Sequence, residues 1–92
     1  MTHRIFKYEL EVTDEQQLLL PEHARILSVQ AQNGRLCMWA LVNDGALTNR
    51  RRTFRVIGTG HTVPDNDSLT FLGTVQLRGG ALVFHVFEKD AS

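Results

Sequence analysis

The chain has 92 residues, a hydrophobic fraction of 42%, and ten basic residues that balance ten acidic ones. This size and composition predict a single small domain over residues 1–92 and exclude both a disordered chain and a membrane helix, which needs about 20 apolar residues in a row. Zero net charge argues against non-specific nucleic-acid binding. The single cysteine, Cys37, excludes an intrachain disulfide. Because the sequence shows no apolar leader, we expect a cytoplasmic location.

Strand patterns dominate the first 23 residues. Apolar and charged side chains alternate over residues 5–12, which predicts a strand with Phe6, Tyr8 and Leu10 on one face. Residues 13–17 are compatible with a short capped helical turn. Residues 18–23 then predict a brief strand that a proline turn ends.

A hairpin is predicted around Asn33-Gly34, which lies between two alternating apolar runs. Both residues of such a turn need positive φ, and this dipeptide supplies it. A two-residue turn fixes the register, so we expect Leu27 opposite Ala40 on a core-facing side. The second face is also partly apolar and carries Ile26, Trp39 and Leu41.

A second hairpin is predicted over residues 69–88, with its turn at Gly79-Gly80. In the register that this turn favours, Thr74 lies opposite His85, and we expect a hydrogen bond between them. The second face of this hairpin is again mixed and carries Leu72, Val83, His85 and Phe87.

Six to seven short strands with hairpin turns predict an all-β fold, either an antiparallel β-sandwich or a small barrel. The second faces of both hairpins are half apolar, so we expect them to be buried against another surface. Another sheet of the same chain or a second copy of the protein would provide that surface. We therefore expect a homo-oligomer. Its candidate interface residues are Ile26, Trp39, Leu41, Leu72, Val83, His85 and Phe87.

The segment 50–61, RRRTFRVIGTGH, is the strongest candidate for a ligand site. Arginine forks suit phosphate and carboxylate, and the glycines could shape a nest of backbone N–H groups. Alternation along a strand puts Arg50 and Arg52 on one side and Arg55 on the other, so only one set can face a ligand. The alternative is a solvated strand with a glycine turn. The candidate ligand residues are Arg50, Arg52, Arg55, Thr59 and His61.

Catalytic and metal-binding patterns are missing from the sequence. The histidines lack metal-ligand spacing, and Cys37 in mid-strand is typical of a packed residue. We therefore predict no metal, no cofactor and no catalytic residue. An enzyme would require His61 to meet a carboxylate such as Asp65 in a pocket.

Three stretches, ILSVQAQNGRLCMWALV, FRVIGTGH and FLGTVQLRGGALVFHVFE, resemble a family of small uncharacterised proteins of bacteriophages and bacterial genomes. The resemblance covers nearly the whole chain and carries no catalytic residues with it. It implies an accessory protein of a phage or mobile element that masks a host protein or sequesters a small molecule. Together with the missing catalytic set and the clustered arginines, it predicts a non-enzymatic protein that binds a host protein or an anionic small ligand such as a nucleotide. The alternative is a structural, virion-associated module that assembles without a ligand.

Overall fold

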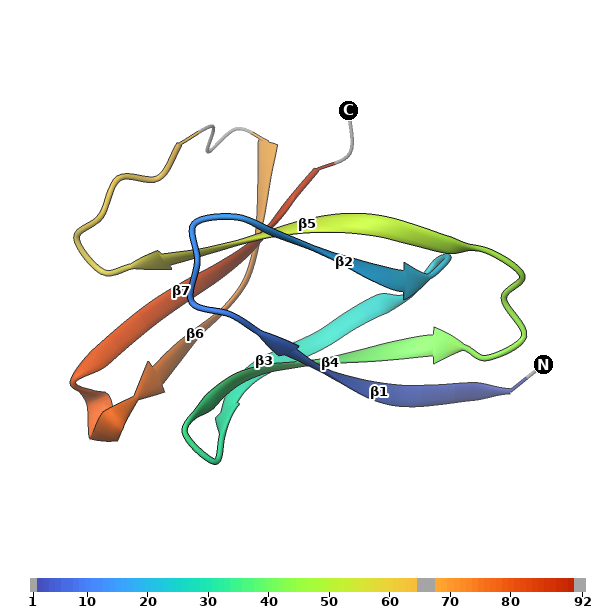
Figure 1. Cartoon of the computed structure of the whole chain (residues 1–92), viewed down its shortest axis with the longest axis horizontal. Coiled ribbons are helices and arrows are strands. Elements are labelled where there is room, and N and C mark those ends of the chain that lie inside the picture. Colours follow the sequence, from blue (N-terminus) through green and yellow to red (C-terminus); the bar gives the residue numbers. More distant parts are fainter. Residues whose placement is uncertain (1, 65–67, 91–92) are drawn as a thin grey trace.

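Two antiparallel sheets form the computed structural model, which describes residues 2–64 and 68–90 (Figure 1). Within these ranges the strands are β1 (His3–Leu10), β2 (Gln16–Pro21), β3 (Arg25–Gln32), β4 (Arg35–Asn43), β5 (Asn49–Gly58), β6 (Leu69–Leu77) and β7 (Leu82–Lys89). One sheet has the strand order β1-β4-β3 and the other the order β2-β5-β7-β6. The predicted all-β fold is confirmed, and the structure is a sandwich rather than a closed barrel.

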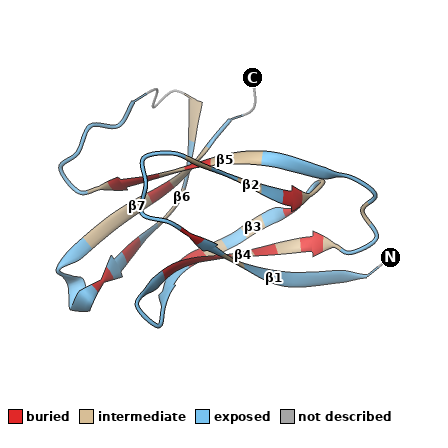
Figure 2. Cartoon of the chain, in the orientation of Figure 1, coloured by how far each residue is buried: buried red, intermediate tan, exposed pale blue. Residues whose placement is uncertain are grey.

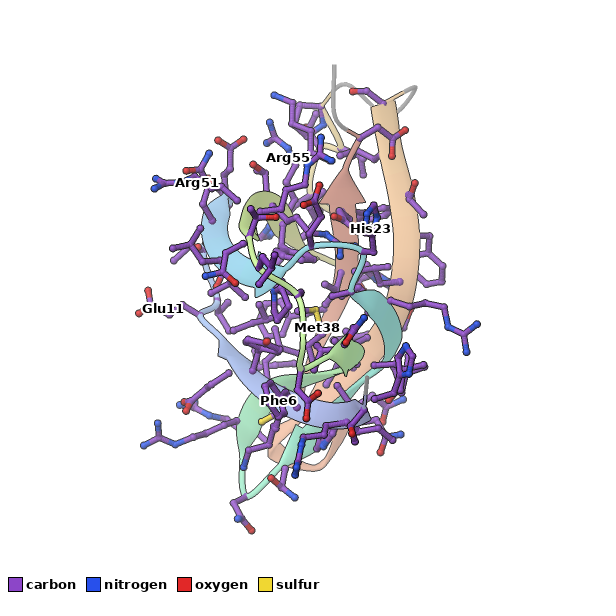
Figure 3. All side chains as sticks on the ribbon, turned by 90° about the vertical axis from the view of Figure 1, so that its right-hand side faces the viewer. Phe6, Glu11, His23, Met38, Arg51 and Arg55 are labelled. Atoms are coloured by element: carbon purple, nitrogen blue, oxygen red, sulfur yellow. The ribbon has the colours of Figure 1, made fainter. Side chains whose placement is uncertain are left out.

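The core lies between the two sheets, because each strand turns alternate side chains inward. Met38, at the middle of β4, is completely buried at the centre of the molecule, whereas Arg51 and Glu11 point outward (Figure 3). Buried stretches of the central strands β4, β5 and β7 face this core (Figure 2). The core residues are Leu10, Leu20, Ala24, Val29, Leu36, Met38, Ala40, Val42, Phe54, Val56, Val75, Leu77 and Val86.

The β3–β4 hairpin turns at Asn33 and Gly34, whose φ angles of 53° and 75° confirm the predicted turn. The expected pairing of Leu27 with Ala40 is wrong. A β-bulge between Ile26 and Ser28 inserts one extra residue, so Ile26 lies opposite Ala40. Because a shift by one residue exchanges the two faces, Ile26 packs against the core and Leu27 is 41% exposed.

The β6–β7 hairpin pairs Leu77 with Leu82 and Thr74 with His85, as predicted. Its turn contains the short 3₁₀ element η2 (Arg78–Gly80), in which Gly79 and Gly80 have positive φ. A second bulge lies in β6 between Phe71 and Gly73. It moves Leu72 from the predicted outer face to the core side, so the predicted face of Leu72 is wrong.

One side of the sandwich is closed by direct contact between β3 and β6. A Cβ atom on Gly73 would lie only 2.6 Å from Cγ2 of Val29, so the absence of a side chain allows the two strands to approach. These strands are not joined by a ladder, because they belong to different sheets. The sandwich is therefore closed here by packing rather than by hydrogen bonds.

The connection between β1 and β2 is not helical. The Gln16 side chain bonds both backbone groups of Glu11, accepting from its N–H at 2.9 Å and donating to its C=O at 2.6 Å. These bonds hold residues 11–16 as a bend, and β2 begins at once. None of the described residues belongs to a helix long and apolar enough to cross a membrane.

Asp44 ties the loop after β4 to strand β1, and its ion pair gives a pH prediction. The Arg4 guanidinium donates to the Asp44 carboxylate at 2.7 Å, and this bond lowers the pKa of Asp44. A carboxyl with a lowered folded pKa stabilises the fold above its unfolded pKa of about 3.9 and loses that contribution as pH falls through the folded pKa.

We therefore expect Asp44→Asn to make stability less dependent on pH between about pH 2 and 5, as measured by urea unfolding. Arg4→Met should have the same effect, because it removes the cause of the shift. The double variant should add nothing further. An unchanged pH profile in both single variants would contradict this role of the ion pair.

Candidate functional site

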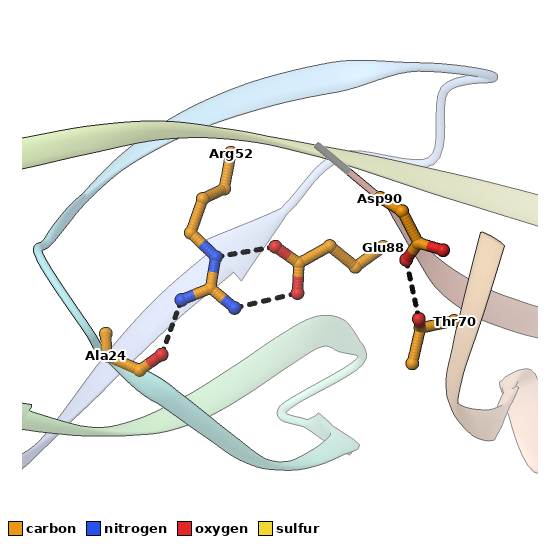
Figure 4. Close-up of polar contacts among 5 residues, drawn as sticks. All are labelled: Ala24, Arg52, Thr70, Glu88 and Asp90. Carbon is orange, nitrogen blue, oxygen red and sulfur yellow. Dashed lines mark hydrogen bonds and ion pairs between the residues drawn. The ribbon is translucent and has the colours of Figure 1, made fainter. Parts of the chain in front are cut away.

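The arginines of segment 50–55 point to different places. Arg52 lies on the inner side of β5, where its Nε and Nη2 atoms bond both Glu88 oxygens at 2.5 and 2.7 Å (Figure 4). Its Nη1 donates to the backbone carbonyl of Ala24 at 2.5 Å. Arg52 therefore links β5, β7 and the start of β3, and its guanidinium donors are already occupied. This arrangement is called the Arg52–Glu88 clasp below.

Arg50 and Arg51 line one hollow of about 260 Å³ together with Arg52 and the end of β7, although their polar contacts differ from those of Arg52. Arg50 is next to Glu22, whose pKa is lowered chiefly by a hydrogen bond from Thr48, with smaller contributions from His23 and then Arg50. Arg51 lies on the outer side and reaches the side chain of Gln17 at 3.5 Å. Arg50 and Arg52 therefore share a hollow at the start of β5, whereas Arg55 lines a different pocket, so the predicted set of three does not converge on one place.

The loop after β5 folds back over the outer face of the four-stranded sheet. His61 N–H donates to the carbonyl of Gly58 at 3.0 Å, and Thr59 N–H donates to Val83 at 3.2 Å. The His61 ring lies against Gly58, where a Cβ atom would be 3.2 Å from it. Both amides are used within the chain, so they are not free for the expected backbone nest.

This loop and β5 enclose a pocket of about 320 Å³. It brings together two of the predicted ligand residues, Arg55 and His61. The pocket therefore combines a guanidinium and an imidazole with apolar walls on the outer sheet face. Its lining consists of Asp14, Arg55, Ile57, His61, Thr62 and Pro64.

Arg55 is the most deeply placed charged group of this site. Its side chain is only 13% exposed, and its Nη2 atom pairs with Glu15 Oε1 at 2.8 Å. Its Nε atom is buried and has no hydrogen-bond partner among the described residues. Such an unsatisfied donor costs about 1–3 kcal/mol, so its position beside a pocket calls for an explanation.

Thr59 belongs to a neighbouring cluster rather than to the pocket. The His85 ring bonds the Thr59 hydroxyl through Nε2 at 2.8 Å and the Thr74 hydroxyl through Nδ1 at 3.0 Å. The predicted bond between His85 and Thr74 is thus confirmed. This bridge joins β6, β7 and the end of β5, so it fixes the base of the loop that carries His61.

The remaining predicted interface residues lie on two different surfaces. Trp39 and Leu41 are half-buried on the outer face of the three-stranded sheet, on the side of β4 opposite Met38. Val83 and Phe87 are on the outer face of the other sheet, where the Phe71 and Phe87 rings are 5.5 Å apart. They do not form one continuous patch.

Several residues of the pocket escaped the sequence reasoning. Ile57 shares the outer face of β5 with Arg55 by simple alternation, and this signal was available. Asp14 and Glu15 come from the β1–β2 connection, and nothing local indicates their approach to β5. Asp65, the carboxylate suggested for an enzyme, lies outside the described residues.

These features define a small antiparallel β-sandwich protein with a polar pocket on an outer sheet face. The chain belongs to the DUF7352 family, a domain of unknown function whose model matches residues 1–92. Neither a curated protein nor a solved structure matches the chain. The expectation of an uncharacterised family is therefore confirmed.

Proposed function

We propose that this protein is a non-enzymatic binding protein that takes a small anionic ligand of the nucleotide class in the pocket between Arg55 and His61. The observation that carries the proposal is the convergence of these two side chains, from β5 and the following loop, on one hollow of about 320 Å³. Ligand sites are concave, mostly pre-formed and lined by apolar walls with a few polar groups.

The lining suits a ligand with an anionic group and a planar body. Arg55 and His61 supply donors for phosphate or carboxylate oxygens, while Ile57 and Pro64 supply an apolar surface. Asp14 can accept a hydrogen bond from an amino or hydroxyl group of the same ligand. A nucleoside monophosphate offers all three kinds of group.

Arg55 retains capacity for such a ligand although it already pairs with Glu15. The guanidinium has five N–H donors, and the recorded ion pair engages Nη2. The buried Nε donor has no acceptor among the described residues, and a bound anion that shifts the side chain slightly would satisfy it. Ligand binding would thereby remove the free-energy cost of leaving this buried N–H donor without an acceptor.

Binding rather than catalysis is proposed because a general base is normally oriented by a second group. Within residues 2–64 and 68–90, His61 is held by its backbone N–H, which donates to the carbonyl of Gly58, and its ring lies against Gly58. The family resemblance supports a phage or mobile-element accessory role in the host cytoplasm. A host protein that presents an acidic group is the second partner compatible with this pocket.

The test is a calorimetric titration with nucleoside mono- and diphosphates, cyclic nucleotides and inorganic phosphate, together with thermal melts. A ligand at 100 times its Kd should raise the melting temperature by about 10–20 °C. Arg55→Met should weaken binding at least tenfold, because it removes the central donor.

Arg51→Met is the matched control, since it removes the same charge from the same face of β5 outside the pocket. It should leave affinity within about twofold. If no member of the panel binds, or if both variants weaken binding equally, the assignment of this pocket is wrong.

A further inference from the structure

Strand β2 is an open edge of the four-stranded sheet, since it pairs only with β5. Its sequence, QQLLLP, contains no charged residue, and within it Gln17 and Leu19 are exposed while Leu20 is buried (Figure 2). Proteins usually protect edges with charges, bulges or cover, because exposed backbone groups invite pairing. The edge strand β1 has such charges in Arg4, Lys7 and Glu9, and β3 and β6 cover each other.

One hydrogen bond determines which backbone groups β2 turns outward. Glu22 N–H donates to Thr48 C=O at 3.0 Å, immediately beyond the last paired residues of β2 and β5. Bonded positions alternate in an antiparallel ladder, so the even-numbered residues of β2 bond to β5. The odd-numbered residues therefore direct their N–H and C=O groups away from the sheet.

These outward groups form a short, self-complementary set. Gln17 and Leu19 each present one N–H and one C=O to the outside. Pro21 has no N–H, and its carbonyl accepts from Ala24 at 3.1 Å, which ends the free edge. Both residues are exposed, Leu19 by 57%, and among the described residues no second strand pairs with this edge.

We propose that β2 pairs with β2 of a second copy of this chain, antiparallel about a two-fold axis at Leu18. Gln17 of each copy then lies opposite Leu19 of the other, and every outward N–H and C=O of these two residues gains a partner. Two four-stranded sheets become one eight-stranded sheet. The strand is its own complement, which is the requirement of a two-fold interface.

The side chains fit this register. Leu18 packs partly against the core, and on the axis it meets Leu18 of the second copy, which covers its remaining surface. Arg51 lies beside Leu19 on β5, but the two copies of Arg51 are about three strand spacings apart, roughly 14 Å. That separation exceeds the Debye length of about 8 Å, so their repulsion is largely screened.

The interface is small, so we expect a dimer in the micromolar range rather than a permanent one. Sedimentation velocity over a concentration series should show monomer converting to dimer. Leu19→Lys should weaken the dimer at least tenfold, because it places a charge at the edge. Leu19→Pro should do the same by removing an outward N–H, without breaking a bond to β5.

Leu47→Lys is the matched control, because Leu47 is 99% exposed in the loop before β5 and away from this edge. It should leave the dimer unchanged. The register is tested by Leu18→Cys, which should form an intermolecular disulfide on mild oxidation, while Cys37 is buried.

A chain that stays monomeric at all concentrations overturns the proposal. The β2 edge would then be available for pairing with a strand of another protein. A dimer that survives both Leu19 variants overturns it as well, because another surface then holds the copies together. Thermal melts of each variant check that the protomer is folded. None of these results depends on the ligand pocket.

Discussion

Arg52→Ala is expected to lower the free energy of unfolding by about 2–3 kcal/mol, as measured by urea denaturation. The Arg52 and Glu88 side chains are only 20% and 18% exposed, and the substitution leaves the Glu88 carboxylate without its partner. It also removes the donor to the carbonyl of Ala24. Breaking one side of a fully buried pair costs about 3–5 kcal/mol, and partial exposure reduces this value.

Arg51→Ala is the matched control, because it removes the same side chain from the next position. Its contact with Gln17 is a long one of 3.5 Å at the surface, so the change should stay within about 0.5 kcal/mol. Arg52→Met combined with Glu88→Met should recover much of the loss, since no unpaired charge then remains. Equal losses at Arg51 and Arg52 would show that the clasp does not stabilise the fold.

Gly73→Ala is expected to destabilise the protein by about 1–2 kcal/mol. The added Cβ atom would lie 2.6 Å from Cγ2 of Val29, which is buried and β-branched and so cannot turn aside easily. Overpacking of a core costs about 1–3 kcal/mol. The lower entropy of the unfolded alanine chain offsets only about 0.4–1 kcal/mol of this cost.

A double-mutant cycle with Val29→Ala tests the contact itself. Val29→Ala alone leaves a cavity, but in the double variant the new methyl group fills part of that space. The combined loss should therefore be smaller than the sum of the single losses by about 1 kcal/mol. Strict additivity would show that β3 and β6 do not meet at these two residues.

Both hairpins could be predicted from local signals. Asn33-Gly34 and Gly79-Gly80 supply the positive φ that tight turns need, and alternation then sets the pairs nearest each turn. The opposite orientations of Arg52 and Arg55 follow from the same period of two. Such relations involve residues close in sequence, and a single strand pattern contains them.

The two bulges could not be predicted in this way. One lies at Leu27 in β3 and the other at Leu72 in β6, next to the contact between Val29 and Gly73. A bulge bends its strand, and these are the two strands at which the sheets approach each other. The errors at Ile26 and Leu72 therefore arise from the packing of one sheet on the other.

The sequence by itself determined the all-β class, the two hairpin turns and the residue pairs beside them. It also determined on which face of β5 each arginine lies. Turn chemistry and alternation act over a few residues, so a local pattern contains this information. Only the tertiary structure decided that Arg52 clasps Glu88, that Arg55 meets His61 and Asp14 in a pocket, and that β2 is left as an open edge. Those arrangements depend on strand order and on the approach of the β1–β2 connection to β5. They join segments far apart in the chain, and alternation within one strand carries no information about its neighbours.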